Sequence, residues 1–269
     1  MIEKIGIMGC GWLGFPLAKH FVAKNYKVYG STTSKDKLAI LGKEGIYPYK
    51  ISLSADGIKG DIQGFLSNIH VLIINIPPKL RGGGSESFIE KIKHLHVEIK
   101  KSNLSKIIFV SSTSIYGKID GEVSEETEPC PVSESGKQLL ASEELLGQDG
   151  ALKTAIVRFG GLIGPDRNPV TMLSDKQNLS NGNQPINLIH LEDCIQMLDA
   201  IVTNNYWNQI FNGVYPLHPT KREYYTAEAL KRNIPPPAYQ DDFSSKTGKI
   251  VISKNFLDKN HFFYTSIVS

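Results

Sequence analysis

The pattern of apolar and polar positions predicts strands that alternate with helices over the first part of the chain. A strand at residues 5–7 is followed by apolar residues at helical spacing over 13–22, and Asn25 is the expected end of that helix. Residues 26–30 and 47–53 then have the composition of short strands. The chain therefore begins as strand, helix, strand and strand.

Two almost continuous apolar runs follow, at residues 70–76 (HVLIINI) and 106–110 (KIIFV). Such runs are typical of strands that are buried on both faces of a sheet. Between them, apolar residues spaced by four, three and four positions predict a helix over 88–99. Strands that alternate with helices of this length imply parallel βαβ units.

One more helix and one more strand complete this part of the chain. Ser135 followed by Gln138 fits a capping box at the start of a helix that extends to Leu146, and residues 154–158 (TAIVR) predict a sixth strand. The fold class that we expect is therefore α/β, a doubly wound parallel sheet of Rossmann type. Beyond Pro165 short helices and turns dominate, which predicts a smaller C-terminal lobe.

Composition and charge narrow the classes of function. With 41% of its 269 residues hydrophobic, the chain can bury a sizeable core. Its 30 basic and 27 acidic residues are interspersed, whereas nucleic-acid binders have a clustered basic face, so we expect no nucleic-acid partner. The apolar runs are too short to span a membrane, and the N-terminus lacks a signal-peptide pattern. Three scattered cysteines, Cys10, Cys130 and Cys194, favour buried thiols and a cytoplasmic location.

Gly9, Gly11 and Gly14 form a GxGxxG pattern between the first predicted strand and the first predicted helix. Such glycines permit a tight turn, close approach of a pyrophosphate and close packing of helix on strand. The N-terminus of the helix adds free N–H groups and a partial positive charge. We therefore predict a dinucleotide site at this turn, which also contains Trp12 and Leu13; an ordinary turn is the alternative.

The end of the second strand bears on the choice of cofactor. An Asp or Glu about 20 residues after the first glycine accepts from the ribose 2′-hydroxyl of NAD. Here Thr32, Thr33, Ser34 and Lys35 occupy this region, and no acidic residue occurs before Asp36. Hydroxyl groups and an ammonium group suit a 2′-phosphate, so we predict NADP in preference to NAD.

Three strings resemble the extended short-chain dehydrogenase/reductases in order and spacing: SSTSIYG at 111–117, RFGGLIGP at 158–165 and NLIHLED at 187–193. Residues 249–257, together with GCGWLG and STTS near the N-terminus, are similar to an atypical branch of that superfamily. The resemblance implies an NAD(P)-binding domain at residues 1–165. It also implies a C-terminal substrate lobe at 166–269 that does not fold independently. Many members of the superfamily pair through a helix bundle, so a homodimer is the candidate assembly.

The resemblance also implies roles for individual residues. Ser112 would polarise the substrate oxygen, Tyr116 would line the substrate side of the nicotinamide, and Gly160 with Gly161 would lie against the cofactor. The whole predicted cofactor site comprises Gly9, Gly11, Trp12, Leu13, Gly14, Thr32, Thr33, Ser34, Lys35, Asn75, Pro77, Ser111, Gly160 and Gly161.

The sequence departs from the family in its proton chemistry. The family's acid/base is a tyrosine with a lysine four residues later, whose charge lowers the pKa of the phenol. None of the eleven tyrosines here has lysine at that spacing. Ser135 and Leu139 occupy the expected positions, and Lys137 points to nearly the opposite side of the helix. The candidate substitutes are Tyr116, Glu134 and His190.

We therefore predict an NADP-dependent oxidoreductase or epimerase that acts on a hydroxyl or carbonyl of a small or nucleotide-sugar-like substrate. The alternative is a non-catalytic NADP(H)-binding sensor or regulatory protein, because the tyrosine–lysine pair is absent. We expect no metal site, since His94 and His96 diverge on their helix. Residues 122–128 are expected to form a solvated loop, and residues 262–264 an aromatic tail docked on the core.

Overall fold

The structure is a computed structural model that describes residues 3–78, 86–240 and 248–267. The chain forms two compact units that are interleaved in the sequence. The first unit comprises Met1–Ile115, Pro131–Arg158 and Ile195–Ile210. The second unit comprises Tyr116–Cys130, Phe159–Cys194 and Phe211–Ser269. The sequence predicts that residues 1–165 bind the cofactor and that residues 166–269 form a substrate lobe. These two assignments concern function, and they stay predictions.

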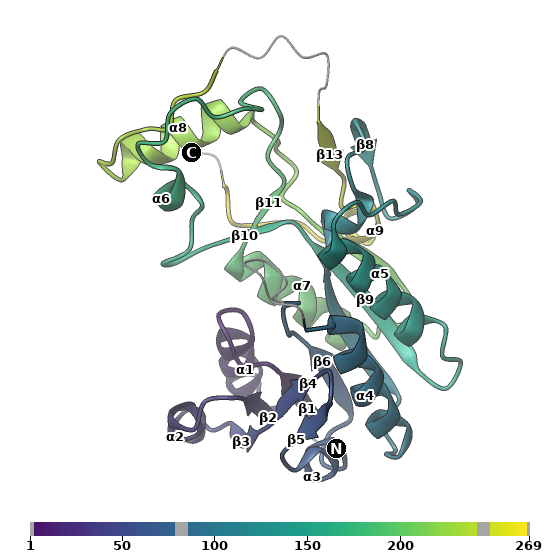
Figure 1. Cartoon of the computed structure of the whole chain (residues 1–269). Coiled ribbons are helices and arrows are strands. Elements are labelled where there is room, and N and C mark those ends of the chain that lie inside the picture. Colours follow the sequence, from purple (N-terminus) through teal and green to yellow (C-terminus); the bar gives the residue numbers. More distant parts are fainter. Residues whose placement is uncertain (1–2, 79–85, 241–247, 268–269) are drawn as a thin grey trace. The chain divides into compact units, whose positions relative to one another are not determined.

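A seven-stranded sheet organises the first unit, to which most of its residues belong (Figure 1). Its strands are β1 (Lys4–Met8), β2 (Lys27–Thr32), β3 (Tyr47–Lys50), β6 (Val71–Ile74), β7 (Lys106–Ser112), β9 (Lys153–Phe159) and β12 (Ile210–Gly213). Their order is β12-β9-β7-β6-β1-β2-β3, and β1 pairs in parallel with both β2 and β6. The strand order therefore reverses beside β1, which confirms a doubly wound sheet of Rossmann type.

Helices cover both faces of this sheet. They are α1 (Gly14–Ala23), α2 (Asp36–Lys43), α3 (Ile62–Leu66), α4 (Phe88–Lys100), α5 (Glu134–Gly147) and α7 (Leu191–Thr203), with a 3-10 turn at Thr113–Tyr116. Figure 1 shows α1 and α7 on one face and α4 beside α5 on the other. Lys24 Nζ joins α1 to α7 because it lies 2.7 and 2.8 Å from the carboxylate oxygens of Asp199. The backbone N–H of Phe88 joins α4 to α5 by donating to Gln138 Oε1 at 2.6 Å.

The apolar periodicity explains where these elements bury their side chains. All four residues of β6 are fully buried, as the continuous apolar run predicts. The four apolar residues spaced along α4 are fully buried as well: Phe88, Ile92, Leu95 and Ile99. Packing of these stripes against the strands supplies the core of the unit.

Two local expectations are wrong. The strand predicted at 47–53 stops at Lys50, and β4 (Ser52–Ser54) instead folds back onto β5 (Gly57–Lys59) as an antiparallel hairpin. Gly57 permits this hairpin because its φ is +140°. Helix α5 is capped by Ser133, whose side chain accepts from the Gly136 N–H, and not by a box at Ser135.

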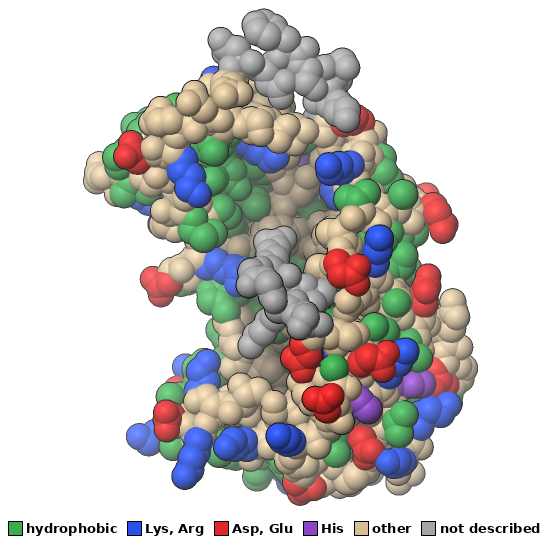
Figure 2. Space-filling view, viewed as in Figure 1, with side chains coloured by type: hydrophobic (Ala, Val, Ile, Leu, Met, Phe, Trp, Pro, Cys, Tyr) green, Lys and Arg blue, Asp and Glu red, His purple; other side chains and the backbone are tan. Residues whose placement is uncertain are grey.

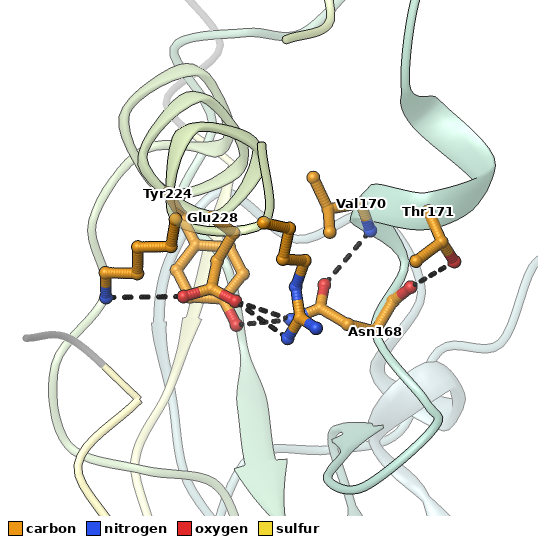
Figure 3. Close-up of polar contacts among 7 residues, drawn as sticks. Asn168, Val170, Thr171, Tyr224 and Glu228 are labelled. Carbon is orange, nitrogen blue, oxygen red and sulfur yellow. Dashed lines mark hydrogen bonds and ion pairs between the residues drawn. The ribbon is translucent and has the colours of Figure 1, made fainter. Parts of the chain in front are cut away.

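The second unit contains short paired strands and helices. They are β8 (Gly121–Val123), β10 (Gly161–Ile163), α6 (Val170–Leu173), β11 (Leu188–His190), α8 (Lys221–Lys231), β13 (Lys249–Val251) and α9 (Lys254–Leu257). β10 pairs with β11 and β13 pairs with β8, both in parallel. The side chain of Asn168 links the start of α6 to α8, since it accepts from the Val170 N–H and donates to Tyr224 and Glu228 (Figure 3).

The acidic stretch at 122–128 is not uniformly solvated. The Glu125 carboxylate accepts from the N–H groups of Asn212 at 2.7 Å, Lys254 at 3.2 Å and Asn255 at 3.3 Å. Burial raises the pKa of this carboxyl, although the three N–H groups oppose that rise. Glu125 therefore anchors its loop to the start of α9, which a run of acidic residues does not reveal.

Two further expectations about single side chains need correction. Cys130 is exposed, whereas Cys10 and Cys194 are buried as predicted. In the tail, Phe262 and Tyr264 expose most of their side chains, so these two rings are not docked. The third ring, that of Phe263, is half-buried and packs against Phe256 with ring centroids 5.4 Å apart. The tail is also held by its backbone, because the Asp193 carboxylate accepts from the Tyr264 N–H at 2.8 Å.

Charged and apolar side chains are interspersed on the visible surface. On the face that Figure 2 shows, lysine and arginine side chains form small groups interrupted by aspartate and glutamate. Among the helices that the structure describes, none combines the length and apolarity needed to span a bilayer.

A buried ion pair connects three elements of the first unit. Arg158 on β9 and Glu143 on α5 are 2% and 3% exposed, and Arg158 Nη2 lies 2.7 Å from Glu143 Oε2. The other carboxylate oxygen, Oε1, accepts from the Ser111 hydroxyl of β7 at 2.5 Å. Helix α5 is thereby fixed against two neighbouring strands of the sheet.

We expect Arg158→Met to lower the free energy of unfolding by about 3–5 kcal/mol, because it leaves the Glu143 carboxylate buried without its counter-ion. The double variant Arg158→Met/Glu143→Leu should lose less, since no unpaired charge remains. Urea denaturation measures both changes, with the exposed Lys153→Met on the same strand as control. Equal stability of Arg158→Met and the wild type would contradict this role of the pair.

Candidate functional site

The turn after β1 can be built only from glycine at two positions. Gly9 has a φ of +103°, and a Cβ at this residue would lie 2.5 Å from the carbonyl oxygen of Asn75. A Cβ at Gly14 would lie 2.2 Å from the carbonyl oxygen of Gly9. Both distances are too short for any side chain, so α1 can begin this close to β1 only with glycine there.

Gly11 differs from these two glycines because the space around it is open. It is exposed, and a Cβ at this position would meet no atom within 4 Å. Next to it, α1 begins at the buried N-cap Leu13, which makes no side-chain capping hydrogen bond, and the first turn carries no acidic residue. The open space at this glycine and the free N–H groups of the helix start can therefore accommodate an anionic group.

Hydrogen bonds from neighbouring strands hold this turn. The Gly9 N–H donates to Ser31 Oγ at 2.9 Å, and the Cys10 N–H donates to the Ser31 carbonyl at 2.8 Å. From the other side, Asn75 Nδ2 donates to the Gly9 carbonyl at 3.3 Å. β1, β2 and β6 therefore meet at the point where the strand order reverses, which is where ligands bind in open α/β sheets.

A cavity of about 350 Å³ lies at this point, within the first unit. It brings together seven of the predicted cofactor residues: Gly9, Gly11, Thr32, Thr33, Ser34, Asn75 and Pro77. Of the other predicted residues of this unit, Leu13 and Gly14 are buried in the start of α1, and Trp12 is half-buried. Lys35 is exposed and does not line the cavity.

Two lysines that the sequence reasoning missed line the same cavity. Lys37, in the first turn of α2, is exposed, whereas Lys91 on α4 is half-buried and forms an ion pair with Glu86. Of the described residues that line the cavity, none carries a carboxylate. Lys37 lies only two residues beyond the predicted loop and was within reach of the sequence argument, but Lys91 gave no local signal.

The remaining wall is mainly apolar and includes Ile51, Leu53 and Ile76. Cys10 also lines the cavity, but burial raises the pKa of its thiol to about 12. This thiol therefore stays protonated near neutral pH and offers no thiolate nucleophile. The cavity suits a ligand with both an apolar and an anionic part.

The end of β7 presents two serines in different ways. Ser111 is buried, and its hydroxyl donates to Glu143, so its oxygen belongs to the buried ion pair described above. Ser112 is half-buried, and its Oγ accepts from the Ser114 N–H at 3.1 Å. The Ser112 hydroxyl hydrogen is then available for another acceptor. The predicted roles of both serines stay predictions.

The predicted residues of the second unit are closely packed. Tyr116 is fully buried, and its hydroxyl donates to Asn212 Oδ1 at 2.9 Å. A Cβ at Gly160 would lie 2.5 Å from the Asn187 carbonyl, and one at Gly161 would lie 2.6 Å from the Leu188 side chain. The structure thus gives these residues packing roles, and their predicted roles toward cofactor and substrate stay predictions.

The two positions that the resemblance assigns to an acid/base pair, Ser135 and Leu139, contain no ionisable group. On α5, Leu139 is buried, Ser135 is half-buried, and Lys137 is exposed. The candidate substitutes have local partners: Glu134 Oε1 accepts from Gln138 Nε2 at 2.7 Å, and His190 Nδ1 accepts from the Glu192 N–H at 3.2 Å.

The two histidines on α4 have separate partners. His94 Nε2 lies 3.0 Å from the Ala55 carbonyl, and His96 Nε2 lies 2.7 Å from Asp149 Oδ2. In the described ranges 3–78, 86–240 and 248–267, no three His, Cys, Asp or Glu side chains are grouped so that they could hold a metal ion.

We expect Gly14→Ala to lower the free energy of unfolding by about 1–3 kcal/mol, because its Cβ forces α1 away from the Gly9 carbonyl. Gly11→Ala should change it by less than about 1 kcal/mol, since its Cβ enters open space. Thermal and urea denaturation of the two variants side by side provide the measurement. Equal losses in both would show that the contact at Gly14 is not the constraint.

Comparison with known proteins extends over nearly the whole chain. No family model matches it. Protein YeeZ of Escherichia coli strain K12 is 30% identical over 264 residues, which cover 98% of this chain and 96% of YeeZ.

Solved structures have the same fold. The UDP-glucose 4-epimerase of Thermotoga maritima, solved with UDP-glucose, matches 98% of this chain and 95% of its own, with a TM-score of 0.81 and 16% identity. The UDP-glucuronic acid 4-epimerase of Bacillus cereus, solved with NAD, matches 98% and 93%, with a TM-score of 0.80 and 18% identity. The chain therefore has the fold of these epimerases and belongs to the family of Escherichia coli YeeZ.

Proposed function

We propose that this protein is an NADP(H)-dependent oxidoreductase or epimerase that acts on a hydroxyl or carbonyl group of a small, sugar-like substrate. The observation that carries the proposal is the cavity at the carboxyl ends of β1, β2 and β6. Its wall combines the glycine turn with the hydroxyl groups of Thr32, Thr33 and Ser34 and the ammonium group of Lys37.

The residues of this cavity fit a dinucleotide. The open space at Gly11 and the start of α1 would hold the pyrophosphate, because backbone N–H groups and the helix dipole both favour an anion there. Thr32 and Thr33, at the end of β2, would face the adenosine ribose. The apolar Ile51 and Leu53 supply packing surface beside them.

The preference for NADP rests on the charge at the end of β2. A 2′-phosphate carries negative charge and needs donors, whereas a ribose 2′-hydroxyl is held by a carboxylate acceptor. This wall offers hydroxyl donors and Lys37, and no carboxylate among its described residues. The epimerase of Bacillus cereus was solved with NAD, so the proposed preference separates this chain from that protein.

When bound, the nicotinamide would exchange a hydride with the substrate. The chain's own contribution is to hold the reacting oxygen, for which Ser112 is the proposed donor because its hydroxyl is half-buried at the end of β7. Without the family's tyrosine–lysine pair, the protein lacks an assistance that is worth about 10²–10⁴ in rate. We therefore expect slower turnover than in enzymes that have this pair.

Calorimetric titration with NADP⁺, NADPH, NAD⁺ and NADH at one ionic strength tests the cofactor proposal. We expect the phosphorylated forms to bind at least about tenfold more tightly, because charge-assisted hydrogen bonds are worth about 1.5–3 kcal/mol. Lys37→Gln should remove most of this preference and leave NAD(H) affinity unchanged. Lys43→Gln, an exposed lysine at the other end of α2, is the matched control. Tighter binding of NAD(H) than of NADP(H) would overturn the assignment.

Ser112→Ala tests the catalytic role once a screen of sugars and sugar derivatives has found a substrate. We expect kcat to fall by about 10²–10³, as for loss of one donor to a reacting oxygen, with unchanged affinity for NADP(H). Ser114→Ala removes a neighbouring half-buried hydroxyl and should keep most of the turnover. Equal turnover by Ser112→Ala and the wild type would exclude the role. Tight NADP(H) binding without turnover of any compound would favour the sensor alternative.

A further inference from the structure

A second cavity, of about 500 Å³, lies wholly within the second unit. Its wall comes from the loop at 117–120, the segment at 181–188, the first turn of α8 and the start of β13. This volume lies within the range of about 300–1,000 Å³ that is typical of small-molecule sites. Nothing in the proposed cofactor site uses these residues.

The described wall of this cavity has an excess of positive charge. Lys118, Lys221 and Lys249 line it, whereas Asp120 supplies its one described carboxylate. Asp120 Oδ1 accepts from the Gly248 N–H at 2.8 Å, so this carboxylate is already engaged with the backbone. The electrostatic environment therefore favours an anionic ligand.

Two of these lysines are half-buried, and each donates a hydrogen bond to a neutral group. Lys221 Nζ donates to Gln184 Oε1 at 3.0 Å, and Lys249 Nζ donates to the Gly117 carbonyl at 3.0 Å. Burial lowers the pKa of both ammonium groups, which means that the folded protein gives up part of their hydration. A bound anion would compensate for that loss.

Hydrogen bonds around the cavity fix the backbone positions of Lys221 and Lys249. Asn187 Nδ2 donates to the Lys249 carbonyl at 2.8 Å, and Asn187 Oδ1 accepts from the Val251 N–H at 2.7 Å. The Lys221 N–H donates to the Gln184 carbonyl at 2.9 Å. Because the fold itself uses this N–H of α8, the lysine side chains rather than the helix N-terminus would bind the anion.

Helix α8 is itself fixed within the second unit. Figure 3 shows Asn168 reaching from the start of α6 to Tyr224 and Glu228 on α8, at 3.3 and 3.0 Å. The capping box between Thr220 and Glu223 also fixes the first turn of the helix. Lys221 therefore projects from a rigid base.

The described wall contains one aromatic residue, so it offers little surface for stacking of a nucleobase. Its aromatic residue, Tyr225, is buried and packs edge-on against Tyr224 with ring centroids 5.2 Å apart. The wall instead carries the carboxamides of Asn181 and Gln184, and Gln184 keeps its NH₂ group as a donor. Carboxamides beside ammonium groups match a ligand with hydroxyl groups and one anionic group.

We propose that this cavity binds a sugar phosphate, with the phosphate held by Lys221 and Lys249 and the sugar hydroxyls held by the carboxamides of Asn181 and Gln184. That this ligand is the substrate rests on the proposed function, whereas its binding in the cavity does not. The proposal separates this chain from the epimerase of Thermotoga maritima, which was solved with UDP-glucose.

Calorimetric titration of the full chain, without dinucleotide, tests the proposal. The probes are glucose 1-phosphate, glucose 6-phosphate and galactose 1-phosphate, with glucose and UDP-glucose for comparison. We expect at least one sugar phosphate to bind at least about tenfold more tightly than glucose, and UDP-glucose to gain less than about tenfold over glucose 1-phosphate. Lys221→Gln and Lys249→Gln should each weaken sugar phosphate binding by about tenfold or more, because each removes a charge-assisted hydrogen bond.

Lys153→Gln, an exposed lysine of the first unit, is the matched control, and thermal denaturation checks that each variant is folded. Sugar phosphate binding that the lysine variants do not weaken, or no binding of any sugar phosphate, would overturn the proposal. Much tighter binding of UDP-glucose would overturn it in favour of a nucleotide ligand. Failure here with intact NADP(H) binding would leave the cofactor proposal standing, and the reverse result would leave the cavity proposal standing.

Discussion

The close contact between Gly14 and the Gly9 carbonyl determines where α1 starts, and much of the first unit depends on it. A helix that starts this near the end of β1 directs its N-terminus at the point where the strand order reverses. Ser31 and Asn75 then hold the turn from the two flanking strands. The cavity is therefore a product of backbone geometry, and its chemistry is set by the few side chains that the neighbouring loops add.

The buried pair of Glu143 and Arg158 has a corresponding role for the far half of the sheet. It fixes α5 against β7 and β9. In the short-chain dehydrogenase/reductases that the sequence resembles, the corresponding helix carries the acid/base pair. This chain has Ser135 and Leu139 at the positions that the resemblance assigns to that pair. The contacts that fix α5 in the core therefore do not depend on an ionisable group at either of these two positions.

The sheet, the glycine turn and the apolar stripe of α4 could be predicted because each is a local pattern in the sequence. The start of the α5 helix and the break after Lys50 each depend on a single turn, so helix caps and strand ends were less predictable. Lys91 reaches the cofactor cavity from α4, and Glu125 looks like its solvated neighbours in sequence. The cavity of the second unit joins segments separated by more than one hundred positions, between 117 and 249. No local pattern can signal such a site.

The side chain of Asn187 fixes the register of strand β13, because it bonds both the Lys249 carbonyl and the Val251 N–H. β13 is only three residues long and pairs with β8, so few hydrogen bonds of its own define its alignment. A slip by one residue would turn Lys249 to the opposite face of the strand and bring its apolar neighbour Ile250 to the cavity. One carboxamide supplies both the donor and the acceptor that bond this strand. An aspartate at position 187 could therefore keep only the bond from the Val251 N–H, and a leucine could keep neither bond. The uncharged side chain of Asn187 thus determines whether β13 places a positive charge in that cavity.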